Sequence, residues 1–312
     1  MLSTHRVLQA QIALFTPYLQ SGISELVSNQ EKEIWLYRDD HTRDKILEPA
    51  LSKEFLLRFC EQLASYYALP FDAAHPMLYA SLPFTRCRVS ANHFSITTTQ
   101  QISLNIRVPS AQVFSLKSFA LGARCAYGYA HLQKWVQGGH NILISGGTAS
   151  GKTSLLNALL ACIPKQTRLV SVEDSQELDL SAFENAVGLL VSKGEQNLRY
   201  EDALNMAVRM RPDRLMVGEI DTRNTLLFLR LGNTGHKGML STLHANSVHQ
   251  VLEAIALNLE MGSRARLPFH VVERYVKSAI DVVIQVGKQG GAHVIQEALL
   301  AQDLGAESSQ SL

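Results

Sequence analysis

Apolar side chains recur at every fourth position over residues 51–67. The stripe consists of Leu51, Phe55, Phe59, Leu63 and Tyr67. This spacing places all of them on one face of a helix, so it predicts an amphipathic α-helix that packs against a core.

Segments with strand character surround this helix. Apolar and polar residues alternate strictly from Ile102 to Val108, and shorter strand-like runs occur at 33–37 and 77–82. Such alternation is typical of an antiparallel sheet with one solvated face. Residues 1–108 are therefore predicted to form a small N-terminal α+β domain.

The pattern changes after Pro109 and Ser110, which end the alternating strand. The following residues have no strong period, so we predict a linker over 109–120. From 121 to 312, short apolar strands alternate with helical patterns; the strands read NILIS, RLVSVE, RLMVGE and MLSTLH. This order predicts an α/β domain with a mainly parallel sheet covered on both faces.

The last part of the chain continues with helical patterns near 248–260 and 269–279. After them come the apolar runs DVVIQV and HVIQEA, separated by Gly290 and Gly291. Two strands joined by a glycine turn predict a terminal β-hairpin.

One glycine-rich turn between a predicted strand and a predicted helix matches the phosphate-loop pattern GxxxxGK[ST] at every required position. The predicted nucleotide-binding residues are Gly146, Gly147, Thr148, Ala149, Ser150, Gly151, Lys152, Thr153 and Ser154. Small residues let backbone N–H groups converge on phosphates at the positive end of the helix. Lys152 would contact the β- and γ-phosphates and Thr153 would bind Mg²⁺. The alternative is a glycine-rich turn without a ligand; the full match favours ATP binding with Mg²⁺.

Three later strands each end in a side chain suited to catalysis: Glu173, Glu219 and His244. Phosphoryl transfer to water needs a metal, a group that orients the water and a sensor of the γ-phosphate. We predict catalytic roles for all three and for Lys152, and a further metal role for Glu219. The alternatives are a surface acid in an acidic patch for Glu173 and a half-buried structural histidine for His244.

An arginine cluster, Arg209, Arg211 and Arg214, precedes the strand that ends near Glu219. An arginine presented across a subunit contact can stabilise transition-state charge. A solvated face at the end of a helix explains the cluster equally well.

Charge and cysteine content narrow the class of partner. Lysine and arginine total 29 against 28 acids, so the formal net charge of +1 provides no chain-wide field for DNA, and no direct nucleic-acid partner is expected. The four cysteines form no CxxC pair and fit a reducing cytosol. The start of the chain lacks the features of a secretory signal, so we expect a cytoplasmic protein that can dock peripherally on a membrane complex.

Four sequence boxes in order resemble those of the type II/type IV secretion ATPase superfamily. They read GGTASGKTSLLNALL, SVEDSQEL, RMRPDRLMVGEI and NTGHKGMLSTLHANS. The chain is most similar to the traffic ATPases of type IV secretion and conjugation systems, because it lacks the four-cysteine motif of type II members. The resemblance implies a RecA-like C-terminal domain, a homohexameric ring and docking on inner-membrane channel components.

By motif, the resemblance makes Glu173 the acidic-box glutamate, Glu219 the Walker B glutamate and His244 the histidine-box residue. It also implies that Arg107, in IRVPS, reaches the nucleotide from the first domain. Arg88 corresponds to a second such arginine, with Arg86 as the alternative alignment. The stretch GEIDTRNT departs from the family, because Asp221 and Asn224 replace expected charges.

Three functions stay open at this stage. The favoured one is an ATP-hydrolysing motor that powers substrate translocation or pilus biogenesis. A pilus-retraction or assembly ATPase of the same superfamily is the second. A nucleotide-dependent scaffold with weak hydrolysis is the third, and a motor acting directly on DNA is disfavoured by the near-neutral charge.

Overall fold

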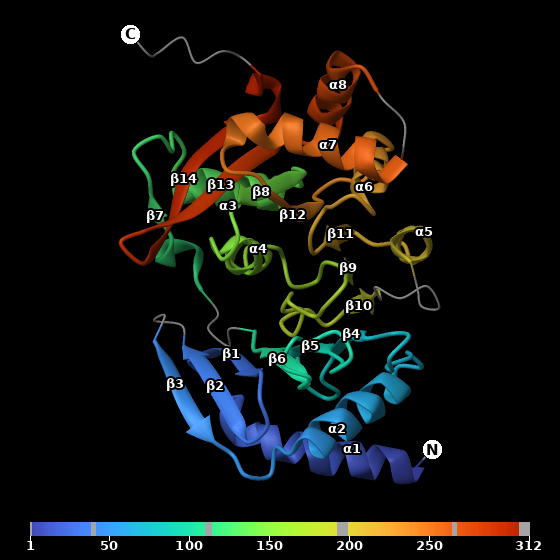
Figure 1. Cartoon of the computed structure of the whole chain (residues 1–312). Coiled ribbons are helices and arrows are strands. Elements are labelled where there is room, and N and C mark those ends of the chain that lie inside the picture. The colour runs from blue at the N-terminus through green and yellow to red at the C-terminus, as the bar shows by residue number, and fades with distance from the viewer. Residues whose placement is uncertain (1, 39–41, 110–113, 192–198, 264–266, 306–312) are drawn as a thin grey trace. The chain divides into compact units, whose positions relative to one another are not determined.

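The structure, a computed structural model, describes residues 2–38, 42–109, 114–191, 199–263 and 267–305. Contacts divide these residues into two compact units. The first extends to residue 109, and the second takes in the residues from 114 to 191 and from 199 onward. Figure 1 shows the first unit in blue to teal and the second in green to red. Each unit has its own sheet and its own core.

The sheet of the first unit is antiparallel and six-stranded, in the order β3-β2-β1-β6-β5-β4. Its strands are β1 (Ile23–Ser28), β2 (Glu33–Arg38), β3 (Arg43–Leu47), β4 (Met77–Ser81), β5 (Arg88–Asn92) and β6 (Ser103–Arg107). The strands predicted at 33–37, 77–82 and 102–108 are β2, β4 and β6. The sequence analysis missed β1, β3 and β5.

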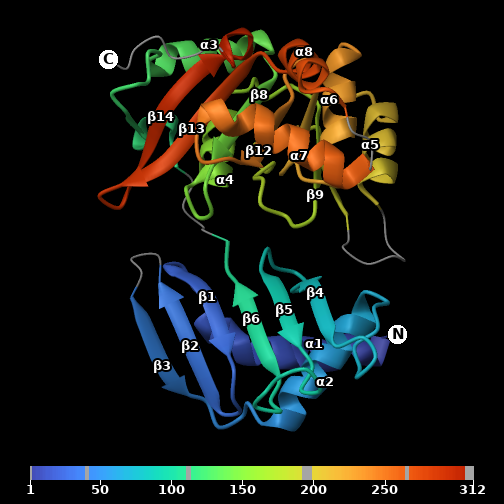
Figure 2. The same ribbon diagram turned by 45° about the horizontal axis from the view of Figure 1, so that its top comes forward.

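Two helices, α1 (Leu2–Phe15) and α2 (Lys53–Tyr66), cover one face of this sheet (Figure 2). Ser52 begins α2, because its side chain accepts a hydrogen bond from the Phe55 backbone N–H at 3.1 Å. The predicted stripe faces the core, where Phe59 and Leu63 are fully buried. Helices on one face of an antiparallel sheet confirm the α+β class of the first unit.

The sheet of the second unit has eight strands in the order β10-β9-β11-β12-β8-β13-β14-β7. Its strands are β7 (Ala120–Leu121), β8 (Ile142–Gly146), β9 (Leu169–Glu173), β10 (Ala186–Leu190), β11 (Arg214–Val217), β12 (Leu240–His244), β13 (Val282–Gln289) and β14 (Ala292–Leu300). All neighbouring pairs except β13 with β14 are parallel, which confirms the predicted fold class.

Helices cover both faces of this sheet. They are α3 (Tyr129–Gly138), α4 (Lys152–Leu160), α5 (Tyr200–Arg209), α6 (Thr225–Asn233), α7 (Val251–Ser263) and α8 (Phe269–Ala279). Successive residues of a strand point to opposite faces of the sheet and pack into two separate cores. Leu143 packs with α5 to α8, whereas Ile142 and Ile144 pack with α3 and α4. Burial on both faces explains why these strands read as continuous apolar runs.

The terminal hairpin is β13 with β14, as predicted, and Gln289 pairs with Ala292 across a two-residue loop. Both loop residues, Gly290 and Gly291, have positive φ, at 58° and 82°. A turn with positive φ at both central positions requires residues without a Cβ penalty, and it matches the twist of the strands.

The predicted linker extends too far into the second unit. Residues 110–113 lie outside the described residues, but a short 3-10 helix (Leu116–Ser118) and β7 follow them. Leu116 and Phe119 are buried in the core that contains α3 and α4. A segment without periodicity can still contribute to a core through single large side chains, which is why the pattern did not reveal it.

Candidate nucleotide site

Four neighbouring parallel strands, β9, β11, β12 and β8, end at the same edge of the second sheet. His244 pairs with Gly146, and Val217 pairs with Val172 one residue before Glu173. The register therefore brings the phosphate loop, the acidic box, the Walker B glutamate and the histidine box together. Ligands of parallel α/β sheets bind at this edge.

The phosphate loop runs from the end of β8 to the start of α4. Gly151 has φ 96° and Ala149 has φ 57°, so the loop passes twice through the left-handed region. At Gly146 a Cβ would lie 2.6 Å from the Val286 carbonyl oxygen, which excludes any larger residue. Backbone constraints of this kind explain the glycine positions of the motif.

The Lys152 side chain is almost fully buried, with 8% of its surface exposed. Its Nζ donates to the carbonyl oxygens of Gly146 at 3.1 Å and Gly147 at 2.9 Å, and lies 3.2 Å from His244 Nδ1. Charged phosphate oxygens are stronger acceptors for an ammonium group than neutral carbonyls. Lys152 is thus held in the loop by partners that a phosphate can replace.

Glu177 contacts the predicted magnesium residue, and the sequence analysis missed its role. The Thr153 hydroxyl donates to Glu177 Oε2 at 2.7 Å, and Asn157 Nδ2 donates to the Glu177 carbonyl oxygen at 3.0 Å. The sequence analysis assigned no function to Glu177. Its position four residues after Glu173 in the same loop was the available signal.

Glu173 is buried, with 3% of its surface exposed, at the end of β9. Its Oε2 accepts from the backbone N–H groups of Glu177 and Leu178 at 2.9 Å, and Oε1 accepts from Ser171 Oγ at 3.0 Å. Burial raises the pKa of Glu173, and these hydrogen bonds oppose that shift only in part. A carboxylate has about four acceptor sites, so roughly one stays open beside these three bonds.

Glu219 follows β11, and its Oε1 lies 2.9 Å from His244 Nε2. This is an ion-pair distance without hydrogen-bond geometry, and Oε1 itself is buried. Burial raises the pKa of Glu219, whereas the nearby His244 and Lys152 act to lower it. The two groups that act to lower the pKa of Glu219 therefore come from the same loop and strand that would contact the nucleotide.

The second-unit residues fit a nucleotide and its magnesium ion. Glu219 Oε1 and Ser150 Oγ are buried oxygens with no hydrogen-bond partner among the described residues. Such atoms need polar ligands. Mg²⁺ is usually bound by one or two protein oxygens together with substrate phosphates. Thr153, Glu219 and Glu177 offer such oxygens around the loop.

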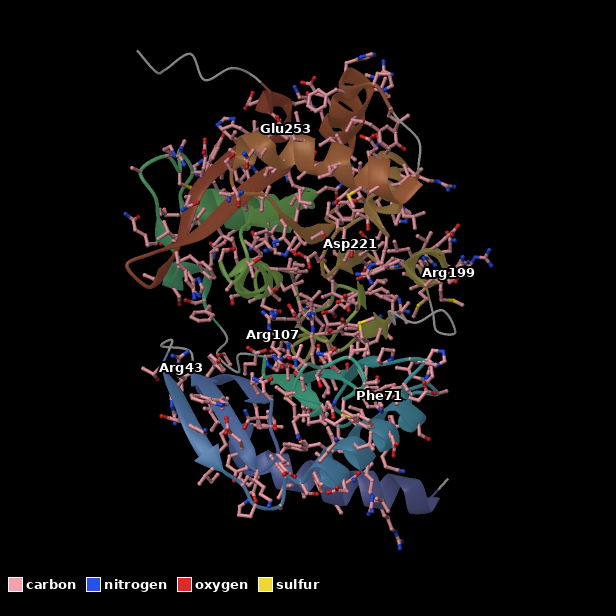
Figure 3. The ribbon with its side chains drawn as sticks, in the orientation of Figure 1. Arg43, Phe71, Arg107, Arg199, Asp221 and Glu253 are labelled. Atoms are coloured by element: carbon pink, nitrogen blue, oxygen red, sulfur yellow. The ribbon has the colours of Figure 1, made fainter. Side chains whose placement is uncertain are left out.

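The two residues that depart from the family build the loop after β11. Asn224 is buried; its Oδ1 accepts from the Asp221 backbone N–H and its Nδ2 donates to the Glu219 carbonyl oxygen, both at 2.9 Å. Asp221, labelled in Figure 3, accepts from Arg223 Nε at 2.8 Å. Arg223 also contacts Asp174 at 3.2 Å. The altered charges therefore pair locally and tie this loop to the acidic box.

Arg88 and Arg107 lie in the first unit, directly opposite each other on β5 and β6. Figure 3 labels Arg107 at the end of β6. Side chains that pair in an antiparallel register share a face, and like charges in this arrangement are destabilising. Glu25 of β1 lies opposite Arg107 on its other side, so a carboxylate flanks this pair. Their predicted contact with the nucleotide stays a prediction.

One member of the arginine cluster, Arg214, has a structural contact in its own unit. Arg214 begins β11, and the candidate site lies at the other end of that strand. Its guanidinium donates to the Gln137 carbonyl oxygen at 3.3 Å, and burial lowers its pKa. A Cβ at Gly238 would overlap with this guanidinium. Arg214 therefore has a structural role within its own unit.

The fold and these side chains define a P-loop nucleotide hydrolase of the RecA-like class. The profile of the type II/IV secretion system protein family matches residues 14–289. The chain therefore belongs to this family, as predicted. Family membership and a complete phosphate loop identify it as a nucleotide-binding, ATP-hydrolysing enzyme.

Several relatives have type IV secretion names. The chain is 29% identical over 302 residues to the type IV secretion system protein PtlH of Bordetella pertussis, covering 88% of both chains. It is 30% identical over 287 residues to VirB11 of Bartonella henselae, covering 80% of both. The predicted similarity to the type IV secretion branch is confirmed.

Solved structures agree on the fold. The VirB11 ATPase from the Brucella suis type IV secretion system, in complex with sulphate, aligns with a TM-score of 0.51 at 23% identity, covering 97% of this chain and 96% of that one. The pilus retraction motor PilT with bound ADP aligns with a TM-score of 0.65 at 17% identity, covering 92% and 82%.

Proposed function

We propose that the protein is the ATP-hydrolysing motor of a type IV secretion or conjugation system. The observation that carries this proposal is the convergence of Lys152, Glu173, Glu219 and His244 at one sheet edge beside the phosphate loop. The relatives with type IV secretion names favour this branch over pilus retraction.

The loop from Gly146 to Ser154 binds the phosphates of ATP. Lys152 exchanges its carbonyl partners for β- and γ-phosphate oxygens, and backbone N–H groups at the start of α4 face the same charge. Thr153 and Glu219 would hold Mg²⁺, and Glu177 accepts the hydrogen bond that orients the Thr153 hydroxyl. When bound, the ion neutralises charge on the phosphates.

Glu173 accepts the proton of the attacking water. The water oxygen bonds to the γ-phosphorus while the bond to the β,γ-bridging oxygen breaks, which yields ADP and phosphate. Two features support this role: burial raises the pKa of Glu173, and three hydrogen bonds fix its orientation. His244, beside both Lys152 and Glu219, contacts the γ-phosphate and stabilises the charge of the transition state.

The proposals for the oligomeric ring and for its partners are based on family membership. We propose a homohexamer in which Arg107 and Arg88 contact the nucleotide from the first unit. The ring acts in the cytoplasm and docks peripherally on inner-membrane channel components, without direct nucleic-acid binding. No helix among the described residues has the length and apolar character needed to cross a bilayer.

Phosphate release from the purified protein with Mg-ATP tests the enzymatic part. Lys152→Ala is expected to lower the rate at least about 100-fold, because it removes the charge that binds the transferred phosphate. Lys165→Ala is the matched control; Lys165 lies over the Phe183 ring at 4.5 Å and should leave the rate unchanged. Equal rates for Lys152→Ala and the wild type would contradict the proposal.

Light scattering tests the ring. The wild-type protein with a non-hydrolysable ATP analogue is expected to have the mass of six chains. A monomer with and without nucleotide, at concentrations that support hydrolysis, would contradict the ring and leave the ATPase assignment standing.

A further inference from the structure

A histidine from the terminal hairpin lies against the phosphate loop. His293, the second residue of β14, has its Nδ1 3.2 Å from the Ser150 carbonyl oxygen. A Cβ at Gly151 would lie 2.5 Å from the same nitrogen. The imidazole ring therefore packs on the loop at the Ser150–Gly151 peptide, one peptide before the one that joins Gly151 to Lys152.

The direction of this hydrogen bond follows from the chemistry of the two groups. A carbonyl oxygen only accepts, so His293 Nδ1 carries the hydrogen and donates. Burial lowers the pKa of His293, an effect that the Ser150 hydrogen bond opposes. The ring presents one oriented N–H donor to the loop through Nδ1.

This bond sets the orientation of one loop amide. The C=O and N–H of a trans peptide point in opposite directions, and the described peptide bonds are all trans. With the Ser150 carbonyl held toward His293, the Gly151 N–H points away from the ring, toward the opposite side of the loop. Phosphate loops bind their ligand through such N–H groups.

The imidazole itself is held by aromatic neighbours. The Phe114 ring packs edge-on at a centroid distance of 5.3 Å, and the fully buried Phe119 ring packs at 5.5 Å. Aromatic contacts of this geometry add stability beyond area burial. A fixed ring can hold the loop peptide in one orientation before the nucleotide arrives, which lowers the entropy lost on binding.

We propose that His293 is a positioning residue for ATP: its Nδ1–H holds the Ser150–Gly151 peptide so that the Gly151 N–H faces the phosphates. The inference rests on the proposed nucleotide site. His293 acts through the loop and does not contact the nucleotide.

Titration calorimetry of the full chain with Mg-ATP tests the inference. His293→Leu removes the donor at similar volume and is expected to weaken binding roughly three- to tenfold, the range of one lost hydrogen bond. His293→Asn places an amide donor near the Nδ1 position and should restore the affinity to within about twofold. His293→Gln, whose amide extends one carbon further, should bind as weakly as His293→Leu. His270→Leu, at an exposed histidine of α8, is the matched control and should not change the affinity.

Rescue separates positioning from simple packing. Wild-type affinity for His293→Leu would overturn the inference, and so would equal affinities for the Asn and Gln variants. The Asn and Gln pair carries the test alone if His293→Leu does not fold. A parallel Lys152→Ala titration tells the two proposals apart: binding that survives this change would overturn the nucleotide site itself and the inference with it. Loss of binding in Lys152→Ala, with no effect of His293→Leu, would remove only the role of His293.

Discussion

Two carboxylates at neighbouring strand ends both have a raised pKa, but their hydrogen-bond and charge partners differ. Burial is the main cause of a raised pKa for both Glu173 and Glu219. Glu173 is held by uncharged donors, namely two backbone N–H groups and a serine hydroxyl. Glu219 Oε1 lies 2.9 Å from His244 Nε2, and the Lys152 ammonium group is nearby, as are the carboxylates of Asp174 and Glu177.

The difference assigns each carboxylate a different task. Neutral donors orient a buried carboxylate and leave it basic, which suits a proton acceptor. The nearby Lys152 ammonium group favours the charged form of Glu219, which suits a group that binds a metal ion. Exposure also differs, because Glu173 is 3% exposed whereas the Glu219 side chain is 43% exposed. The charge of the neighbouring groups adds a second distinction.

The largest expected effect is that of Glu173→Gln. The amide can keep the hydrogen bonds to the loop but is not basic, so hydrolysis of Mg-ATP should fall at least about 100-fold. Affinity for Mg-ATP should stay within about twofold, and the Tm should not fall because no charge is buried. Phosphate release, calorimetry and thermal unfolding measure the three quantities. Hydrolysis within tenfold of the wild type would show that Glu173 acts only by supporting the loop.

Glu219→Gln should act mainly through magnesium. Removing the charge is expected to raise the Mg²⁺ concentration for half-maximal hydrolysis about 10- to 100-fold, the range seen when groups around a metal are changed. A magnesium titration at saturating ATP measures this shift. If the magnesium dependence of Glu173→Gln moved instead, the two assignments would have to be exchanged.

Lowering the pH should decrease the rate of hydrolysis but increase the contribution of Glu173 to stability. Hydrolysis needs the charged form of Glu173, so its rate should fall about tenfold per pH unit below a pKa that lies above the ordinary glutamate value. Because the folded-state pKa is raised, the contribution of Glu173 to stability is full below the unfolded-state pKa and is lost as pH rises through the folded-state value. Rate profiles and denaturant unfolding across this window check both signs. An acid limb at the ordinary glutamate pKa would contradict the burial argument.

The smallest expected effect concerns the contact between the loop after β11 and the loop after β9, which Arg223 makes through Asp174. Arg223→Ala removes the contacts to Asp174 and Asp221 and should lower the free energy of unfolding by about 1 kcal/mol or less, because these pairs are partly exposed. It should also lower hydrolysis more than Arg199→Ala, a control that breaks an exposed ion pair with Asp202. Denaturant unfolding and phosphate release compare the two variants. Equal rates for both would mean that Arg223 does not couple the loops.

Local pattern predicted much of the fold. The period over 51–67 predicted α2, and the apolar runs before Gly146, Glu173 and His244 predicted β8, β9 and β12. Helix α1 was missed although Leu8, Ile12 and Phe15, all buried, have helical spacing. The spacing of these three residues is therefore a local signal that the sequence does contain.

Contacts between distant residues could not be read from pattern. Glu177 meets Thr153 across 24 residues, and His293 meets Ser150 across 143. Both contacts depend on the order of the strands in the sheet. The hydrophobic period along the chain carries no information about that order. The spacing of Glu177 from Glu173 marks it as a candidate, but the partners of Glu177 and of His293 are known only once the chain is folded.

A crystal structure with Mg²⁺ and a non-hydrolysable ATP analogue tests the central assignment most directly. Lys152 Nζ, now 3.1 Å and 2.9 Å from the carbonyl oxygens of Gly146 and Gly147, should leave these atoms and contact the β- and γ-phosphates. The metal should lie on the Thr153 hydroxyl. Density for the phosphates away from the loop, with Lys152 still on the two carbonyls, would contradict the account.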